Sequence, residues 1–94
     1  MDTTTSIQKG QVVKSKAGRD KGRVFVIYDI IDDQHVLLCD GDLRKLNCPK
    51  RKKIKHLMVY NSVIENFAKM LKSNEKINDA FVRKQLNAFY SEEN

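Results

Sequence analysis

The stretch VFVIYDIIDDQHVLLCDGD, residues 24–42, determines the fold class of this 94-residue chain. A run of β-branched and aromatic residues at 23–31 predicts a long strand. A polar turn follows at 32–34, and residues 35–39 return as a second strand of a hairpin. Because residues 24–28 are apolar at consecutive positions, we expect both faces of the first strand to be covered.

Further strands on either side extend this hairpin into a small β-structure. One strand is predicted at residues 11–15, and two more at 43–46 and 53–59. The Asp-Gly pair at 40–41 favours a tight turn before the first of the later strands. Pro49 interrupts the pattern, because it lacks a backbone N–H donor. Five short strands with short connections are typical of a small barrel.

The sequence pattern changes from strand to helix after residue 60. Ser62 and Glu65 have the spacing of a capping box, and apolar residues then recur with the period of a helix. A second helix is predicted to begin near Asn78. These two amphipathic helices are the only segments left to cover the outer face of the strand at 24–28, so we expect them to pack on the outside of the barrel.

The predicted organisation has three parts. Residues 1–8 form a flexible N-terminal arm, residues 9–60 form the mainly β barrel, and residues 61–94 form the helical extension packed on it. A chain of this length has room for one small domain, which excludes a large multi-domain enzyme.

Positive charge is concentrated in two blocks. The net charge is +6, but residues 9–23 hold six basic residues and one acid, and residues 43–57 hold seven basic residues and no acid. Between them, residues 24–42 hold five acids and no basic residue. Charge gathered this way costs folding free energy through repulsion, and RNA would neutralise it with release of counterions. A solvated basic face is the alternative interpretation.

Several other classes of function are excluded or find no support. No apolar run approaches the roughly 20 residues of a membrane helix. Cys39 and Cys48 are too few for a disulfide scaffold, and we expect two reduced thiols in a cytoplasmic protein. Their spacing with His56 fits no usual zinc pattern. We therefore expect no metal, no cofactor and no enzymatic activity.

A resemblance to a known family rests on two stretches. GQVVKSKAGRDKGRVFV, residues 10–26, resembles a KOW motif, with Gly22 at the position of the signature glycine. DGDLRKLNCPKRKKIKHL, residues 40–57, is similar to the continuation in the KOW subfamily of the large-subunit ribosomal protein fourteen of eukaryotes and archaea, which includes small bacterial RNA-binding proteins. The resemblance covers about residues 9–60. It implies an SH3-like five-stranded barrel and a ribosome-related role in RNA binding.

The candidate RNA contacts are the cations of the two basic blocks. Arginines among them can form forked contacts with phosphate, whereas lysines act as point charges. His56 either contacts RNA or ends a strand, and Asp20 is expected to cap backbone N–H groups of its loop. The RNA-binding set is Lys14, Lys16, Arg19, Lys21, Arg23, Arg44, Lys45, Lys50, Arg51, Lys52, Lys53, Lys55 and His56, and the structural set is Gly18, Asp20, Gly22, Gly41 and Pro49.

The predicted function is non-enzymatic binding of structured ribosomal RNA, or of the ribosome, by a protein that is monomeric without RNA. Ribosomal proteins are further candidate partners. Aromatic residues make up only 7% of the chain, and of these Tyr28 and Tyr60 could be exposed. Recognition is therefore expected to rest on shape and backbone instead of stacked bases. The alternative is a protein-interaction module of the transcription or translation machinery that uses the barrel and the helical tail.

Overall fold

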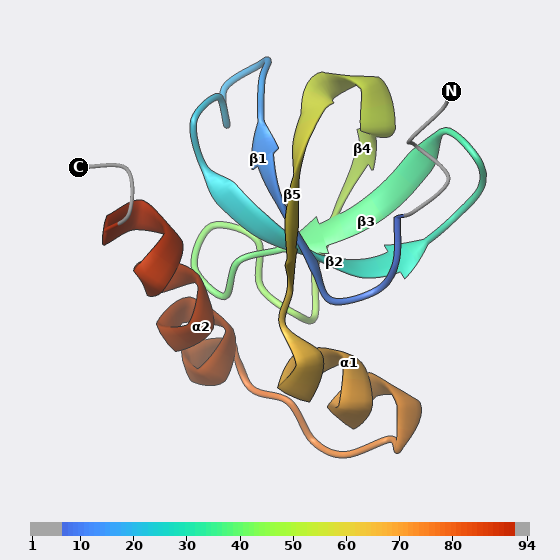
Figure 1. The fold of residues 1–94 in the computed structure, drawn as a ribbon, viewed down its shortest axis with the longest axis vertical. Coiled ribbons are helices and arrows are strands. Elements are labelled where there is room, and N and C mark those ends of the chain that lie inside the picture. Colours follow the sequence, from blue (N-terminus) through green and yellow to red (C-terminus); the bar gives the residue numbers. More distant parts are fainter. Residues whose placement is uncertain (1–6, 92–94) are drawn as a thin grey trace.

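The computed structural model describes residues 7–91, which form a five-stranded antiparallel sheet followed by two helices (Figure 1). Most of the predicted arm, residues 1–6, therefore lies outside the described residues, as do residues 92–94. The sheet has the strand order β4-β3-β2-β1-β5. The elements are β1 (Gln11–Ser15), β2 (Val24–Ile30), β3 (His35–Cys39), β4 (Lys50–Lys53), a 3-10 turn (Ile54–His56), β5 (Leu57–Val63), α1 (Glu65–Lys72) and α2 (Asp79–Ser91).

The sheet is not closed into a barrel. β4 pairs only with β3 and β5 only with β1 among the described residues, so these two strands are the edges of an open sheet. The 3-10 turn carries the chain from one edge to the other at one end (Figure 1). The predicted closure is therefore wrong, because the four-residue β4 ends in this turn before it can reach β5, while the antiparallel sheet with two helices after it is confirmed.

The strand predicted at residues 43–46 is not formed. The Asp40 carboxylate accepts hydrogen bonds from the backbone N–H groups of Asp42 and Arg44, both at 2.9 Å. The N–H of Asp40 in turn donates to the carbonyl of Arg44 at 2.9 Å. These bonds fold residues 40–44 back on themselves, and the strand forms instead directly after Pro49.

The last strand and the first helix both begin later than predicted. Residues 54–56 form the 3-10 turn, where the N–H of Ile54 donates to the carbonyl of Gln34 at 2.8 Å, so β5 begins at Leu57. It runs through Val63, past the predicted boundary at residue 60. The predicted capping box at Ser62 is wrong, because the N–H of Ile64 donates to Gly10 at 2.8 Å and keeps the chain extended until α1 begins.

Two apolar clusters form on the two faces of the sheet. In β2, Val24 and Val26 pack on one face, and Phe25 and Ile27 pack on the other. The first cluster, called here the helix-side core, includes Ile64, Phe67, Val82 and Leu86 from the helical part of the chain. The second core includes Val13, Phe25, Ile27, Val36, Leu38 and Leu57. The expectation that both faces of β2 are covered, one of them by the helices, is confirmed.

α2 is also held by polar contacts with the loop between β3 and β4. A carboxylate oxygen of Asp79 accepts a hydrogen bond from the N–H of Leu46 at 2.8 Å, and Arg83 donates to the carbonyl of Gly41 at 2.6 Å. Gly41 has φ of +77°, and a Cβ at this position would overlap the carbonyl oxygen of Asp79. Glycine is therefore required where this loop meets α2. No helix within residues 7–91 is both long enough and apolar enough to cross a membrane.

Candidate nucleic-acid interface

The two basic blocks meet where the loop at 16–22 contacts β4. Nζ of Lys52 donates a hydrogen bond to the carbonyl of Ala17 at 3.0 Å. Figure 1 shows this loop and the connection from β4 to β5 at the same end of the sheet. We call the cations of the loop and of β4 the basic cluster, which consists of Lys16, Arg19, Lys21, Lys50, Arg51, Lys52 and Lys53.

Asp20 lies at the centre of this contact. Its side chain is only 8% exposed, and its carboxylate is 3.9 Å from the guanidinium of Arg44 and 3.9 Å from Nζ of Lys50. In the part of the chain that is described, this carboxylate caps no backbone N–H group, contrary to the prediction. The N–H groups of Lys21 and Gly22 are already bonded to backbone carbonyls, which leaves the carboxylate to pair with cations of the second block.

The loop has the backbone conformation that its glycines suggested. Gly18 and Gly22 have φ of +81° and +90°, a region that other residues rarely adopt. The N–H of Gly22 donates to the carbonyl of Ser15 at 2.9 Å, so the loop closes directly on the end of β1. Pro49 immediately precedes β4, so its missing backbone N–H takes no hydrogen bond away from the sheet. The structural roles assigned to Gly18, Gly22 and Pro49 stay predictions.

Seven of the thirteen predicted RNA contacts are exposed. None of the seven forms an ion pair with another residue between 7 and 91. Their charges are therefore available to a ligand outside the chain. They are Lys16, Arg19, Lys21, Lys45, Arg51, Lys53 and Lys55.

The other predicted contacts are half-buried, and some are held within the protein. Arg44 has a buried Nε without a hydrogen-bond partner among the described residues. The carbonyl of His56 accepts a hydrogen bond from the N–H of Lys16 at 2.8 Å, so His56 lies beside the start of the loop. The half-buried members are Lys14, Arg23, Arg44, Lys50, Lys52 and His56.

Arg23 is the predicted contact with the strongest internal partners. Its guanidinium is 2.9 Å from the carboxylate of Asp40 and 3.2 Å from that of Asp42. Burial acts against its charged form, but the hydrogen bonds and charge of these carboxylates outweigh it and raise the pKa of Arg23. The structure thus groups Arg23 with the acidic turn at 40–42 and not with the basic cluster.

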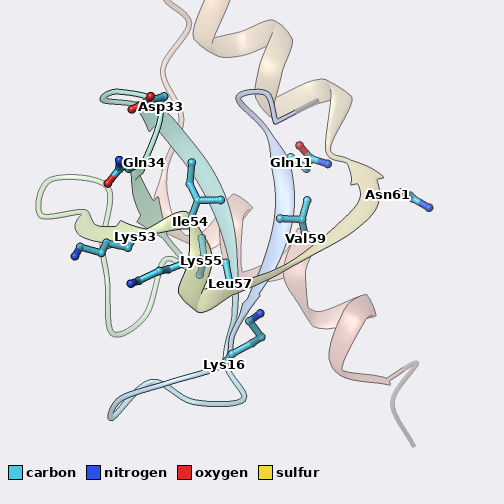
Figure 2. Close-up of a pocket in the computed structure, with 10 residues that line it drawn as sticks. All are labelled: Gln11, Lys16, Asp33, Gln34, Lys53, Ile54, Lys55, Leu57, Val59 and Asn61. Atoms are coloured by element: carbon cyan, nitrogen blue, oxygen red, sulfur yellow. The ribbon is translucent and has the colours of Figure 1, made fainter. Parts of the chain in front are cut away.

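A groove that was not predicted opens beside β5. It has a volume of about 700 Å³ and lies between β1 and β5 on one side and the 3-10 turn and the β2–β3 turn on the other (Figure 2). No residue pattern of β5 indicates this groove, because the groove depends on the turn at residues 54–56, where the N–H of Ile54 donates to the carbonyl of Gln34. The lining residues are Gln11, Lys16, Asp33, Gln34, Lys53, Ile54, Lys55, Leu57, Val59 and Asn61.

The aromatic rings lie away from the basic cluster. Phe25 and Phe67 are buried. Tyr28 and Tyr60 are half-buried against the helix-side core, and their ring centroids lie 6.5 Å from Phe67 and 5.8 Å from Phe89, respectively. The basic cluster itself contains no aromatic residue, so it offers phosphate contacts and no ring on which a base could stack.

The two thiols differ in their surroundings. Cys39 is buried in the helix-side core, and this burial, together with the charges of Asp40 and Asp79, raises the pKa of its thiol from 9.0 to about 12. Cys48 is exposed. Within residues 7–91, no group of three or more His, Cys, Asp and Glu side chains is arranged to hold a metal ion.

The chemistry available to this surface is the binding of anions. Its exposed lysines and arginines extend over the loop, β4 and the 3-10 turn, and they match the dense, repeated charge of a phosphate backbone. Comparison with known proteins adds no relative from which a function could be transferred. No protein-family model matches the chain, and no curated protein is significantly similar to it.

Proposed function

We propose that this protein is a non-enzymatic RNA-binding protein of the KOW type, which acts in the cytoplasm on the phosphate backbone of structured RNA. Ribosomal RNA is the target that the sequence resemblance favours. The observation that carries the proposal is the meeting of two basic blocks, distant in sequence, around Asp20. Like charges that are concentrated at one end of the sheet repel one another and lower the stability of the folded protein, and a bound polyanion offsets this repulsion.

The fold is consistent with this assignment. The antiparallel order of β1, β2 and β3 and the tight loop that ends at Gly22 support it. The open seam between β4 and β5 is a departure from a closed barrel. The loop and β4 are in contact through Lys52 and Ala17, so both can face one RNA helix.

Binding by charge neutralisation predicts how strongly the affinity for RNA depends on salt concentration. Each phosphate contact contributes about −0.9 to the slope of log affinity against log salt concentration for a duplex, and about −0.7 for a single strand. Arg19 and Arg51 are exposed and can each contact a phosphate with two N–H groups. We therefore expect affinity to fall steeply with salt and to depend little on base sequence.

The test replaces only exposed cations, so that the fold is kept. The variant carries Gln at Arg19, Lys21, Arg51 and Lys53. A matched control carries Gln at four exposed lysines of the helical part, Lys69, Lys72, Lys76 and Lys84, and loses the same charge.

Binding to a fragment of ribosomal RNA is measured by fluorescence anisotropy over a range of salt concentrations. The first variant should lose about a hundredfold in affinity at low salt, and the slope of log affinity against log salt concentration should be smaller by about 3 to 4. The control should change much less. Equal losses in the two variants, with unchanged circular dichroism, would contradict a localised RNA site.

A further inference from the structure

β5 is an edge strand without the protection that such strands usually have. Unpaired edges invite pairing with other chains, and natural proteins block them with charged residues, especially lysine. All four residues of β4 (KRKK) are basic, but the seven residues of β5 (LMVYNSV) include no charged residue. Met58 and Val59 are 47% and 39% exposed.

The register with β1 determines which backbone groups of β5 are unpaired. The N–H of Lys16 donates to the carbonyl of His56, so these two residues form a hydrogen-bonded pair. Hydrogen-bonded and non-bonded pairs alternate along an antiparallel ladder. Met58, two residues on and opposite Lys14, therefore also directs its N–H and C=O towards β1.

Leu57 and Val59 lie opposite Ser15 and Val13 as non-bonded pairs, so their backbone groups point away from β1. The N–H of Leu57 already donates a hydrogen bond to the carbonyl of Ile54. The carbonyl of Leu57 and both backbone groups of Val59 consequently face the open edge. They are the donors and acceptors that an added strand requires.

The groove beside this edge has a definite chemical character. Figure 2 shows Ile54, Leu57 and Val59 in its middle, which makes the centre apolar. Three lysines, Lys16, Lys53 and Lys55, line it against a single acid, Asp33. Successive residues of a strand point to opposite sides, so an added strand would place every second side chain in this groove.

We propose that the edge of β5 binds an extended, acidic segment of a partner protein by strand addition. The backbone of the segment pairs with Leu57 and Val59. Its alternate side chains enter the groove, where apolar groups contact Ile54 and carboxylates pair with the lysines. The peptide thus occupies the seam that the sheet leaves open between β5 and β4.

Two other occupants fit this site less well. A second copy of the chain has the same net charge of +6 and would bring its own lysines to the seam. RNA has no alternating peptide N–H and C=O groups to pair with a strand edge, and no aromatic ring lines the groove for a base to stack on. An acidic peptide satisfies both the backbone and the charge.

The first experiment compares two substitutions at one position. Val59→Pro removes the outward N–H and leaves the pairing with β1 intact, whereas Val59→Thr keeps the N–H and the β-branched shape. The probe is a fluorescent peptide in which Glu and Val alternate, and the control is a peptide in which Lys and Val alternate. The acidic peptide should bind the wild type and Val59→Thr with similar affinity, and it should bind Val59→Pro at least tenfold more weakly. For each of these proteins, its affinity should be higher than that of the Lys peptide.

The second experiment uses the unmodified protein, so it does not depend on the folding of a variant. Amide exchange measured by NMR should slow at Val59 when the Glu–Val peptide is added, while Met58, already bonded to β1, should change little. Equal peptide binding by Val59→Pro, or an unprotected Val59 amide, would overturn the proposal. Protection of Val59 by an RNA oligonucleotide instead of the peptide would also overturn it. Val59→Pro should keep its affinity for ribosomal RNA, which separates this proposal from the RNA site.

Discussion

β4 and β5 are the two edges of one sheet, and their chemistry is opposite. Every residue of β4 is Lys or Arg, whereas β5 has no charge over seven residues. Charge on an edge prevents pairing with other strands, and here the same charge makes a surface for phosphates. The two edges of a single small sheet thus suit different ligands, one through electrostatic binding and the other through backbone pairing, and Lys16, Lys53 and Lys55 lie beside both.

The largest expected effect tests whether both edges depend on a shared core. Phe67 is 1% exposed and packs in the helix-side core under the sheet. Phe67→Ala should lower the free energy of unfolding by about 3–5 kcal/mol. Urea denaturation followed by circular dichroism measures this, and binding of RNA and of the acidic peptide should be lost at the same urea concentration. Separate loss of the two binding activities would mean that the edges do not belong to one cooperative unit.

A smaller effect should be confined to the β4 edge. Asp20→Asn removes the carboxylate that lies between Arg44 and Lys50, so that their mutual repulsion is no longer balanced. We expect the free energy of unfolding to fall by about 1–3 kcal/mol. Amide exchange at Val59 should remain as in the wild type when both are measured well below the unfolding transition. A stability equal to that of the wild type would show that Asp20 does not hold the basic cluster together.

The next prediction separates two neighbouring cations of β4. Lys52 donates a hydrogen bond to Ala17, whereas Arg51 is exposed and unpaired among the described residues. Lys52→Gln should cost about 1 kcal/mol of stability through this lost bond. Arg51→Gln should leave stability within about 0.5 kcal/mol of the wild type. For Arg51→Gln, the slope of log affinity for duplex RNA against log salt concentration should become smaller by about 0.9. A loss of stability in Arg51→Gln, together with a loss of RNA affinity in Lys52→Gln alone, would contradict this arrangement, in which Lys52 faces the loop and Arg51 faces solvent.

The last effect is confined to alkaline pH, and it comes from the core behind both edges. Because the pKa of Cys39 is raised from 9.0 to about 12 in the folded protein, its buried thiol contributes stability that is fully present below pH 9. That contribution should be lost as the pH rises from 9 towards about 12, since the unfolded chain then ionises first. Denaturation curves at several alkaline pH values should show a steeper loss for the wild type than for Cys39→Val. Cys48→Ser, at the exposed thiol, should behave as the wild type does.

The central hairpin could be predicted from the sequence because local and tertiary preferences agree there. The consecutive apolar residues of β2 indicated that both faces are covered, and the two cores lie on those faces. Residues 43–46 have a strand-like composition, but the carboxylate of Asp40 holds them in a turn. Ser62 has a capping-box partner, but pairing between Ile64 and Gly10 delays the helix.

The candidate site was predictable in composition and not in detail. The two basic blocks are visible in the sequence, but the sequence does not tell which of their members are exposed. Which cations are held inside the protein depends on partners far along the chain, such as Asp40 for Arg23. The open seam could not be foreseen, since it depends on the turn at residues 54–56 bonding to Gln34 and not on any residue preference of β5.

The contacts of α2 have a consequence for the synthesis of the chain. The hydroxyl of Tyr90 accepts a hydrogen bond from the N–H of Val24 at 2.8 Å, and Val82 and Leu86 complete the helix-side core. Translation produces the strands and α1 first, so a nascent chain that has not yet exposed residues 79–90 has this face of its sheet covered only in part, by Ile64 and Phe67. The helix-side core is therefore complete only when α2 has emerged, and a ribosome stalled before that point would present the uncovered part of the face to chaperones.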